Sequence, residues 1–297
     1  MNTTLKKINC LPFLLAGKGV LYSTSSGSGR PLKKFFRHLP LSGREASSIL
    51  LLFILINTVE AGNQTERQIK QEVSFGTLYG TSSILAEGLA RSTASPLVDY
   101  SYEHDRFFAS LKRGLGYGFV RTQQLRIDTA LGYRAGRSDD EGDLYRGLGN
   151  VKGALVTLVS VDWAPSEILY FYSSASQAIS GPKGFSLIMG TGVGFPIVKR
   201  LNGYVDVSST WGNGDYVQTY YGITPGQAER SIYRTYTPEA GFFNTTVIVG
   251  LVYDVSTKWA INLAVGAARF EGDVRKSPLT VDGRIQPVAH LYVTHRF

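Results

Sequence analysis

The sequence reads Trp259-Ala260-Ile261-Asn262-Leu263-Ala264-Val265-Gly266-Ala267-Ala268 over ten consecutive positions. Bulky apolar side chains hold the odd positions up to Val265, and small or polar side chains hold the even ones. Successive side chains of a β-strand point to opposite faces, so this stretch predicts a strand with one bulky apolar face and one face of small or polar side chains.

The same alternation recurs through the chain, in 125–135, 201–211, 247–255 and 289–297. A soluble β-sandwich also alternates, but the strands predicted from this pattern run about 10 to 15 residues, against ~5–6 for a typical strand. A tilted strand that crosses a bilayer needs ~9–11 residues. Aromatic residues stand near the segment ends, as an interfacial girdle requires. These aromatic residues are Trp163, Trp211, Tyr253, Trp259, Phe270 and Phe297.

Mean hydropathy is -0.04 and no run of 18 apolar residues occurs, which excludes a transmembrane helix as the main anchor. Crossing a bilayer with strands requires a closed barrel, because a free sheet edge would leave backbone groups unsatisfied. The predicted fold is therefore an all-β transmembrane antiparallel β-barrel of 10–12 strands. Ten strands are predicted at 94–103, 106–120, 122–135, 150–163, 166–178, 184–198, 201–213, 241–256, 258–270 and 286–297.

The strand count is left open between ten and twelve. Val73–Tyr79 also has strand character, and accommodating it requires a further strand, for instance by splitting 106–120 near Gly114 and Gly116. Short and long connections alternate along the chain, with short turns expected on the periplasmic side and long loops outside.

A secretory signal is predicted ahead of the barrel. Arg44 precedes the apolar run 49–56, and Val59-Glu60-Ala61 has the small-residue spacing of a cleavage site, with cleavage after Ala61. The predicted organisation is an extended leader (1–61), an N-terminal segment that is periplasmic or the first strand (62–93), and the barrel (94–297).

Most of the net positive charge and the sole cysteine lie in this leader. Of the formal net charge of +8, residues 1–61 carry +6, with eight basic and two acidic residues, so the basicity gives no support to nucleic-acid binding. The sole cysteine, Cys10, also lies in the leader. Disulfides and thiolate metal sites are therefore excluded from the predicted barrel.

Charged residues on the predicted inner face could line a conduit or fill the interior as a paired network. Eight-stranded barrels are filled by their own side chains, whereas barrels of 16–18 strands leave a channel. Ten to twelve strands, with charges of both signs, favour a narrow or filled lumen. The predicted lumen-facing charges are Arg126, Asp128, Arg134, Asp162, Asp206, Asp254 and Arg296.

No catalytic, metal or cofactor site is predicted. His290 and His295 point to opposite faces of one strand, and no serine stands in a Gly-x-Ser-x-Gly elbow. The acidic run 139–143 lacks the EF-hand spacing and is interpreted as a solvated loop. The glycines of 190–194 alternate inside a strand, so we interpret them as lumen-facing positions that make room for bulky neighbours.

The loop sequences resemble the MipA/OmpV family of outer-membrane proteins from about Phe75 to Phe297. The terminal aromatic residue Phe297 is typical of a C-terminal barrel signal. The motif residues, whose role is unknown, are Gly136, Arg137, Asp139, Asp140, Arg146, Gly147, Tyr220, Tyr221, Gly222, Ser277 and Pro278.

The resemblance implies an outer-membrane location and contact with outer-membrane lipid. It also implies a scaffold that links a murein transglycosylase to a penicillin-binding protein of peptidoglycan synthesis. The expected function is thus a non-enzymatic scaffold or envelope-interaction protein, and the alternative is a narrow passive channel for small solutes. Segment 62–93 is a hypothetical partner-binding surface, because short periplasmic turns offer little area.

Overall fold

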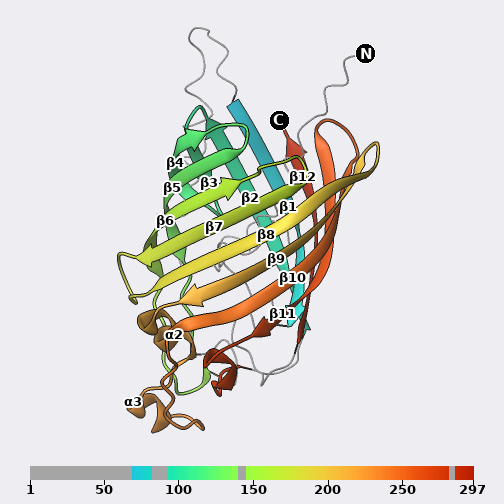
Figure 1. The fold of residues 1–297 in the computed structure, drawn as a ribbon. Coiled ribbons are helices and arrows are strands. Elements are labelled where there is room, and N and C mark those ends of the chain that lie inside the picture. Colours follow the sequence, from blue (N-terminus) through green and yellow to red (C-terminus); the bar gives the residue numbers. More distant parts are fainter. Residues whose placement is uncertain (1–68, 82–91, 140–144, 281–284) are drawn as a thin grey trace, which may run out of the picture. The chain divides into compact units, whose positions relative to one another are not determined.

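A computed structural model describes residues 69–81, 92–139, 145–280 and 285–297. Within them, twelve antiparallel strands form a closed barrel in which each strand pairs with its sequence neighbour and β1 pairs with β12 (Figure 1). The predicted all-β barrel is confirmed, at the upper of the two strand counts. The strands are β1 (Ile69–Thr81), β2 (Ser92–His104), β3 (Phe107–Ser110), β4 (Gly114–Arg121), β5 (Leu125–Arg134), β6 (Ala154–Trp163), β7 (Leu169–Ala178), β8 (Phe185–Val198), β9 (Leu201–Gly212), β10 (Gly241–Asp254), β11 (Trp259–Phe270) and β12 (Gln286–Arg296).

The strand pairing decides two points that the sequence left open. Residues 69–81 form β1 and close the ring against β12, so the barrel begins before residue 94. The predicted strand 106–120 is two strands, β3 and β4, joined by a turn at Leu111–Arg113. Gly114 follows that turn with φ of 79°, a conformation that favours glycine, which is why the split falls there. The leader and the Ala61 cleavage site lie outside the described residues.

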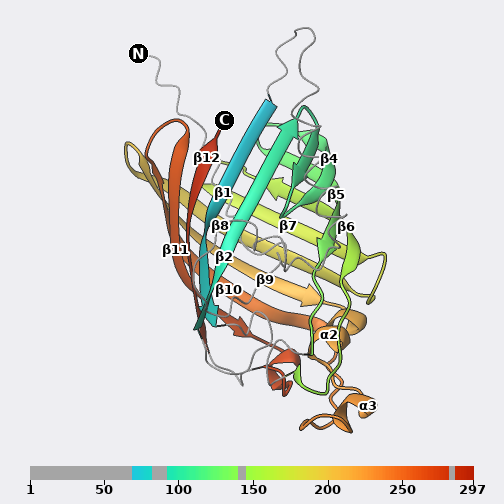
Figure 2. The same cartoon turned by 180° about the vertical axis from the view of Figure 1, so that it is seen from behind.

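The strands define two ends of the barrel. Short turns at 105–106, 122–124, 164–168, 199–200 and 255–258 gather at the end that also holds the C-terminal Phe297, which we call the near end. The long connections gather at the other, far end, together with α2 (Gly214–Tyr221), α3 (Pro225–Ala228) and the short 3-10 helix η4 (Val274–Lys276) (Figures 1 and 2). By the rule that short turns face the periplasm, the far end faces outward.

The two faces of the sheet differ as the alternation predicts. On β11 the odd residues Leu263 and Val265 are 46% and 56% exposed, whereas the even residue Ala264 is 1% exposed. Neighbouring strands continue this apolar outer belt with Val249 and Leu291. An outer surface this apolar is suited to hydrocarbon rather than water.

The aromatic girdle is confirmed at the near end and corrected at one position. Trp163 stacks on Phe171, and Trp259 contacts His295, all near the ends of their strands. Phe270, however, is 3% exposed and packs inside the far end, because it continues the inward, even-numbered face of β11. In the described residues no helix is long and apolar enough to cross a membrane.

Candidate functional site: a filled and capped lumen

A lumen charge cluster occupies the near half of the barrel. It consists of Glu103 on β2, Arg113 in the β3–β4 turn, Arg121 on β4, and Arg126 and Asp128 on β5. The Glu103 carboxylate accepts hydrogen bonds from Arg113 at 2.5 Å and from Arg126 at 2.8 Å. Arg126 also donates to Asp128 at 2.6 Å. Two carboxylates thus hold three guanidinium groups, and the cluster ties β2, β4 and β5 together from inside.

A second polar layer joins three strands further round the wall. Tyr170 and Tyr172 of β7 both donate to the carboxylate of Asp206 on β9, at 3.0 and 2.9 Å. Asp206 is 3% exposed. The intervening strand β8 carries glycines at these positions, and a Cβ at Gly190 or Gly192 would overlap the tyrosine rings. The prediction that these two glycines make room for bulky lumen neighbours is confirmed.

A third set of contacts runs from β9 to β12. The His290 ring nitrogen Nε2 lies 3.1 Å from the Asn262 side-chain oxygen and 3.5 Å from the Tyr204 hydroxyl. His290 is 2% exposed, and its ring stacks on Tyr292. A ring buried in this way packs within the wall and joins β9, β11 and β12 through its contacts.

A compact hydrophobic cluster, the far-end cap, packs at the far end of the barrel. Four of its residues lie on α2, where spacings of one, three and four positions put Tyr216, Val217, Tyr220 and Tyr221 on one face. The helix begins at Asn213, whose side chain accepts a hydrogen bond from the Tyr216 N–H. The remaining cap residues are Tyr145, Leu148, Ile223, Phe243, Phe270, Val274 and Leu279.

Two arginines fix the cap to the rim of the barrel. Arg134, at the end of β5, lies 4.8 Å from the Tyr216 ring centre and donates to the hydroxyl of Ser176 at 2.8 Å. Arg137 lies 4.5 Å from the Tyr145 ring centre. Burial raises the pKa of Tyr216 to about 12, against the opposing effect of the nearby Arg134 cation. The cap therefore presents neutral phenols to these cations at physiological pH.

The predicted inward charges lie in several different environments. Arg126 and Asp128 belong to the lumen charge cluster, Asp206 to the tyrosine layer and Arg134 to the cap contact. Asp162 lies opposite Arg126 in the β5–β6 register. Asp254 and Arg296 form a 3.2 Å ion pair near the ends of β10 and β12, and Arg296 also reaches Glu72 on β1. These last residues belong to the near-end rim rather than to the deep lumen.

Most family motif residues lie at the far end, where they build the cap. Arg137, Tyr220 and Tyr221 belong to its contacts, and Ser277 donates to the Tyr221 carbonyl at 2.6 Å. Gly147 has φ of 86°, and any Cβ there would overlap the backbone of Arg230. Asp139 accepts from the Gly149 N–H, whereas Asp140 lies outside the described residues. Gly136, Arg146, Gly222 and Pro278 flank these contacts.

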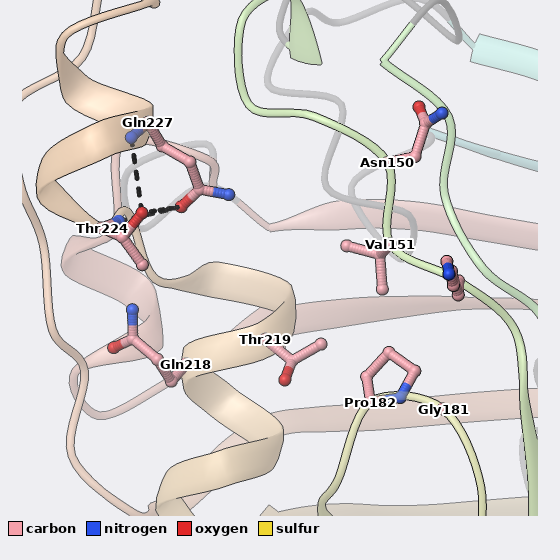
Figure 3. A pocket seen from close by; sticks show the side chains of 9 residues that line it. Asn150, Val151, Gly181, Pro182, Gln218, Thr219, Thr224 and Gln227 are labelled. Atoms are coloured by element: carbon pink, nitrogen blue, oxygen red, sulfur yellow. Dashed lines mark hydrogen bonds between the residues drawn. The ribbon is translucent and has the colours of Figure 1, made fainter.

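A surface cavity of about 600 Å³ opens beside the cap, between two loops and the helices (Figure 3). Its polar groups are largely used within the protein. Gln227 and Thr224 form a reciprocal capping box, and the Gln227 amide donates to the Leu148 carbonyl. We therefore assign no ligand to it. The lining residues are Asn150, Val151, Lys152, Gly181, Pro182, Gln218, Thr219, Thr224 and Gln227.

Comparison with known families shows which family this barrel belongs to. Residues 73–297 match the model of the MltA-interacting protein MipA. The chain belongs to the MipA family. Family membership together with the apolar outer belt identifies it as an outer-membrane β-barrel. Comparison with curated proteins gave no match.

Several solved barrels are similar to this MipA-family chain at low sequence identity. LpxR from Salmonella typhimurium is 14% identical, with a TM-score of 0.46, over 76% of this chain and 100% of that one. The outer membrane channel DcaP of Acinetobacter baumannii is 8% identical, with a TM-score of 0.38, over 80% and 100%. The NanC porin is 10% identical, with a TM-score of 0.38, over 76% and 100%.

Sequence reasoning missed the cap and three of the five residues of the lumen charge cluster. Glu103, Arg113 and Arg121 were not among the predicted inward charges, because Glu103 and Arg121 lie at or just beyond the ends of predicted strands and Arg113 lies in the β3–β4 turn. The cap had a detectable signal: Asn213 precedes apolar residues at helical spacing in a region predicted as loop.

Proposed function

We propose that this chain is a non-enzymatic scaffold of the outer membrane, linked to the peptidoglycan machinery through a murein transglycosylase and a penicillin-binding protein. The observation that carries the proposal is the double filling of the barrel, by the lumen charge cluster in the near half and by the cap at the far end. Such an interior is suited to holding a rigid cylinder in the membrane, and leaves its surfaces for interaction. The family model, named for a protein that interacts with MltA, supports the same role.

The near-end turns are the surface that a periplasmic partner would meet. They carry exposed basic side chains, Arg106, Lys199, Arg200 and Lys258, set among exposed Asp105 and Glu167. Segment 62–93 is a poor target for a deletion test, because it contains β1 and its removal would open the barrel. Charge reversal on the turns tests the interaction without touching the wall.

The experiment compares two double variants of equal charge change. Lys199→Glu/Arg200→Glu alters a near-end turn, and Lys152→Glu/Lys183→Glu alters far-end loops. Binding of a purified murein transglycosylase to the detergent-solubilised barrel is measured by biolayer interferometry. We expect the near-end variant to lose at least tenfold in affinity and the far-end variant to match the wild type. A wild-type barrel that does not bind the transglycosylase would refute the scaffold.

Single-channel conductance distinguishes the scaffold from the alternative function, a narrow passive channel. In planar bilayers we expect no reproducible open steps from the wild-type barrel, because paired charges and the cap obstruct the axis. Regular steps that disappear when the protein is omitted would establish the channel instead.

A further inference from the structure

The barrel wall is only partly built between β2 and β5. β2 has 13 residues, but β3 has four and pairs with β2 only at Ser101–His104. β4 has eight residues and runs back to the near end (Figure 2). A strand needs ~9–11 residues to cross the hydrocarbon core, so β3 covers only the near-end part of the β2 edge, whereas β4 pairs with β5 up to Leu131, three residues before β5 ends.

Beyond this hairpin, two strand edges face each other without a strand between them. The Leu111 N–H donates to the Tyr100 carbonyl at 3.2 Å, and past that point no described strand pairs with this edge of β2. On the other side, β4 pairs with β5 only as far as Leu131. With strands ~4.8 Å apart, two absent strands imply a spacing of about 14 Å. We call this opening the notch, bounded by Leu97–Tyr100, the turn Leu111–Arg113 and Gly132–Arg134.

The notch changes from apolar to polar between its outside and its inside. It lies in the far-end half of the wall, which faces the outer leaflet. The side chains around it that face outward are well exposed, with Val98 at 50%, Leu111 at 57% and Tyr133 at 58%. Just inside, Lys112 lies 3.8 Å from Asp99 and 5.6 Å from the ring centre of Tyr292. An amphiphile would meet hydrocarbon-compatible side chains first and hydrogen-bonding groups behind them.

The free edge of β2 is poorly suited to a partner strand. Pro96 lies within it, opposite Thr77 of β1, and proline supplies no N–H for a further ladder. Proline on an edge strand is one of the features that disfavour strand addition. In a membrane, backbone groups on such an edge can be satisfied by water, and its N–H groups also by lipid headgroup oxygens, without a ladder.

We propose that the notch is a lateral entry from the outer leaflet, occupied by a lipid. Its acyl chain lies against Val98 and Leu111, and the oxygens of its headgroup reach Lys112 and the β2 edge. This proposal is independent of the scaffold function, because it concerns the opposite half of the barrel from the near-end turns.

The test uses a contact quencher carried by lipid. The barrel lacks cysteine, so Lys112→Cys labelled with bimane reports from inside the notch. The protein is reconstituted in phosphatidylcholine vesicles that contain phosphatidylcholine with an acyl-chain nitroxide. Leu263→Cys on the outer belt is the positive control, and Ser174→Cys, which is 7% exposed and faces the lumen, is the negative control. We expect the quenching at position 112 to be at least half of the quenching at position 263. It should also be at least three times the quenching at position 174.

Other outcomes overturn the proposal. Quenching at 112 no greater than at 174 would show that lipid does not enter. Quenching that appears only on dilution of the protein would show that a second copy covers the notch. Quenching by aqueous iodide alone would show a water-filled opening. If Lys112→Cys fails to fold, judged by heat-modifiable gel mobility, Asp99→Cys repeats the measurement from the β2 side.

Discussion

The near half of the lumen and the far-end cap obstruct the same barrel with opposite chemistry. In the near half, the guanidinium nitrogens of three arginines lie 2.5–3.8 Å from the oxygens of two carboxylates. In the cap, eleven mostly aromatic and aliphatic side chains are each at most 7% exposed. The near half therefore depends on charges that satisfy one another, and the cap on surface removed from water.

The two regions also differ in how their residues come together. The lumen charge cluster uses β2 to β5, which are adjacent in the sequence and already paired through the sheet. The cap gathers residues from Tyr145 to Leu279, so it assembles only when loops after β5, β9 and β11 meet. Disruption of the first should weaken the barrel itself, whereas disruption of the second should free loops above an intact barrel.

The largest expected effect is in the charge cluster. Glu103→Gln removes the carboxylate that accepts from Arg113, Arg126 and Arg121, and leaves each of these three guanidinium groups with one charged partner fewer. Loss of one partner from a buried ion pair costs about 3–5 kcal/mol. Urea unfolding in vesicles should show a loss of this order in unfolding free energy, with Glu239→Gln on an exposed loop as the control. A loss below about 1 kcal/mol would mean that the arginines are solvated.

The next effect is local to the cap. Leu279 is 0% exposed, and Leu279→Ala should cost about 2–3 kcal/mol, at the low end for a buried leucine because loops at an open end can collapse. Protease cleavage of the far-end loops should accelerate, while heat-modifiable gel mobility should match the wild type. Loss of that mobility would contradict the separation of cap and barrel.

Sequence reasoning recovered what strand periodicity alone can encode. The outward face of β11, the tyrosine-accommodating glycines and the inward Asp206 all follow from a period of two. Strand β7 carries three consecutive aromatic residues, Tyr170, Phe171 and Tyr172, which hide its alternation. The structure explains this: the two tyrosines turn inward to Asp206, and Phe171 turns outward.

What was left open or missed depends on one backbone angle or on contacts between distant segments. The split of 106–120 stayed an alternative because glycines elsewhere in the chain continue a strand, and the positive φ of Gly114 decides it. Helix α2 has only eight residues, so its N-cap Asn213 is a clearer signal than its period. Its burial requires Phe243 and Phe270, which no local pattern connects to it.

A smaller effect tests the tyrosine layer between the two regions. Gly190→Ala would place a Cβ against the Tyr172 ring and should cost about 1–3 kcal/mol through overpacking. Adding Tyr172→Leu should recover part of the loss, because it removes the overlapping phenol. The matched control is Gly214→Ala, since no atom lies within 4 Å of that Cβ. Equal unfolding free energies for Gly190→Ala and Gly214→Ala would show that the Tyr172 ring moves aside without a loss of stability.

The smallest expected effect distinguishes the two regions by pH. The pKa of Tyr216 is raised to about 12 from an ordinary value near 10, so the unfolded cap loses its proton first as pH rises. The stabilisation is complete below about pH 10 and falls as pH rises towards 12, with a loss of about 1 kcal/mol by pH 11. Protease cleavage of the far-end loops should therefore be faster at pH 11 than at pH 8. The arginines of the charge cluster stay protonated over this range, so they contribute nothing to this change. Burial also raises the pKa of Tyr221 in the same cap, so Tyr216→Phe should remove part of the pH dependence of cleavage and Tyr216→Phe/Tyr221→Phe most of it. An unchanged dependence in the double variant would assign it to another group.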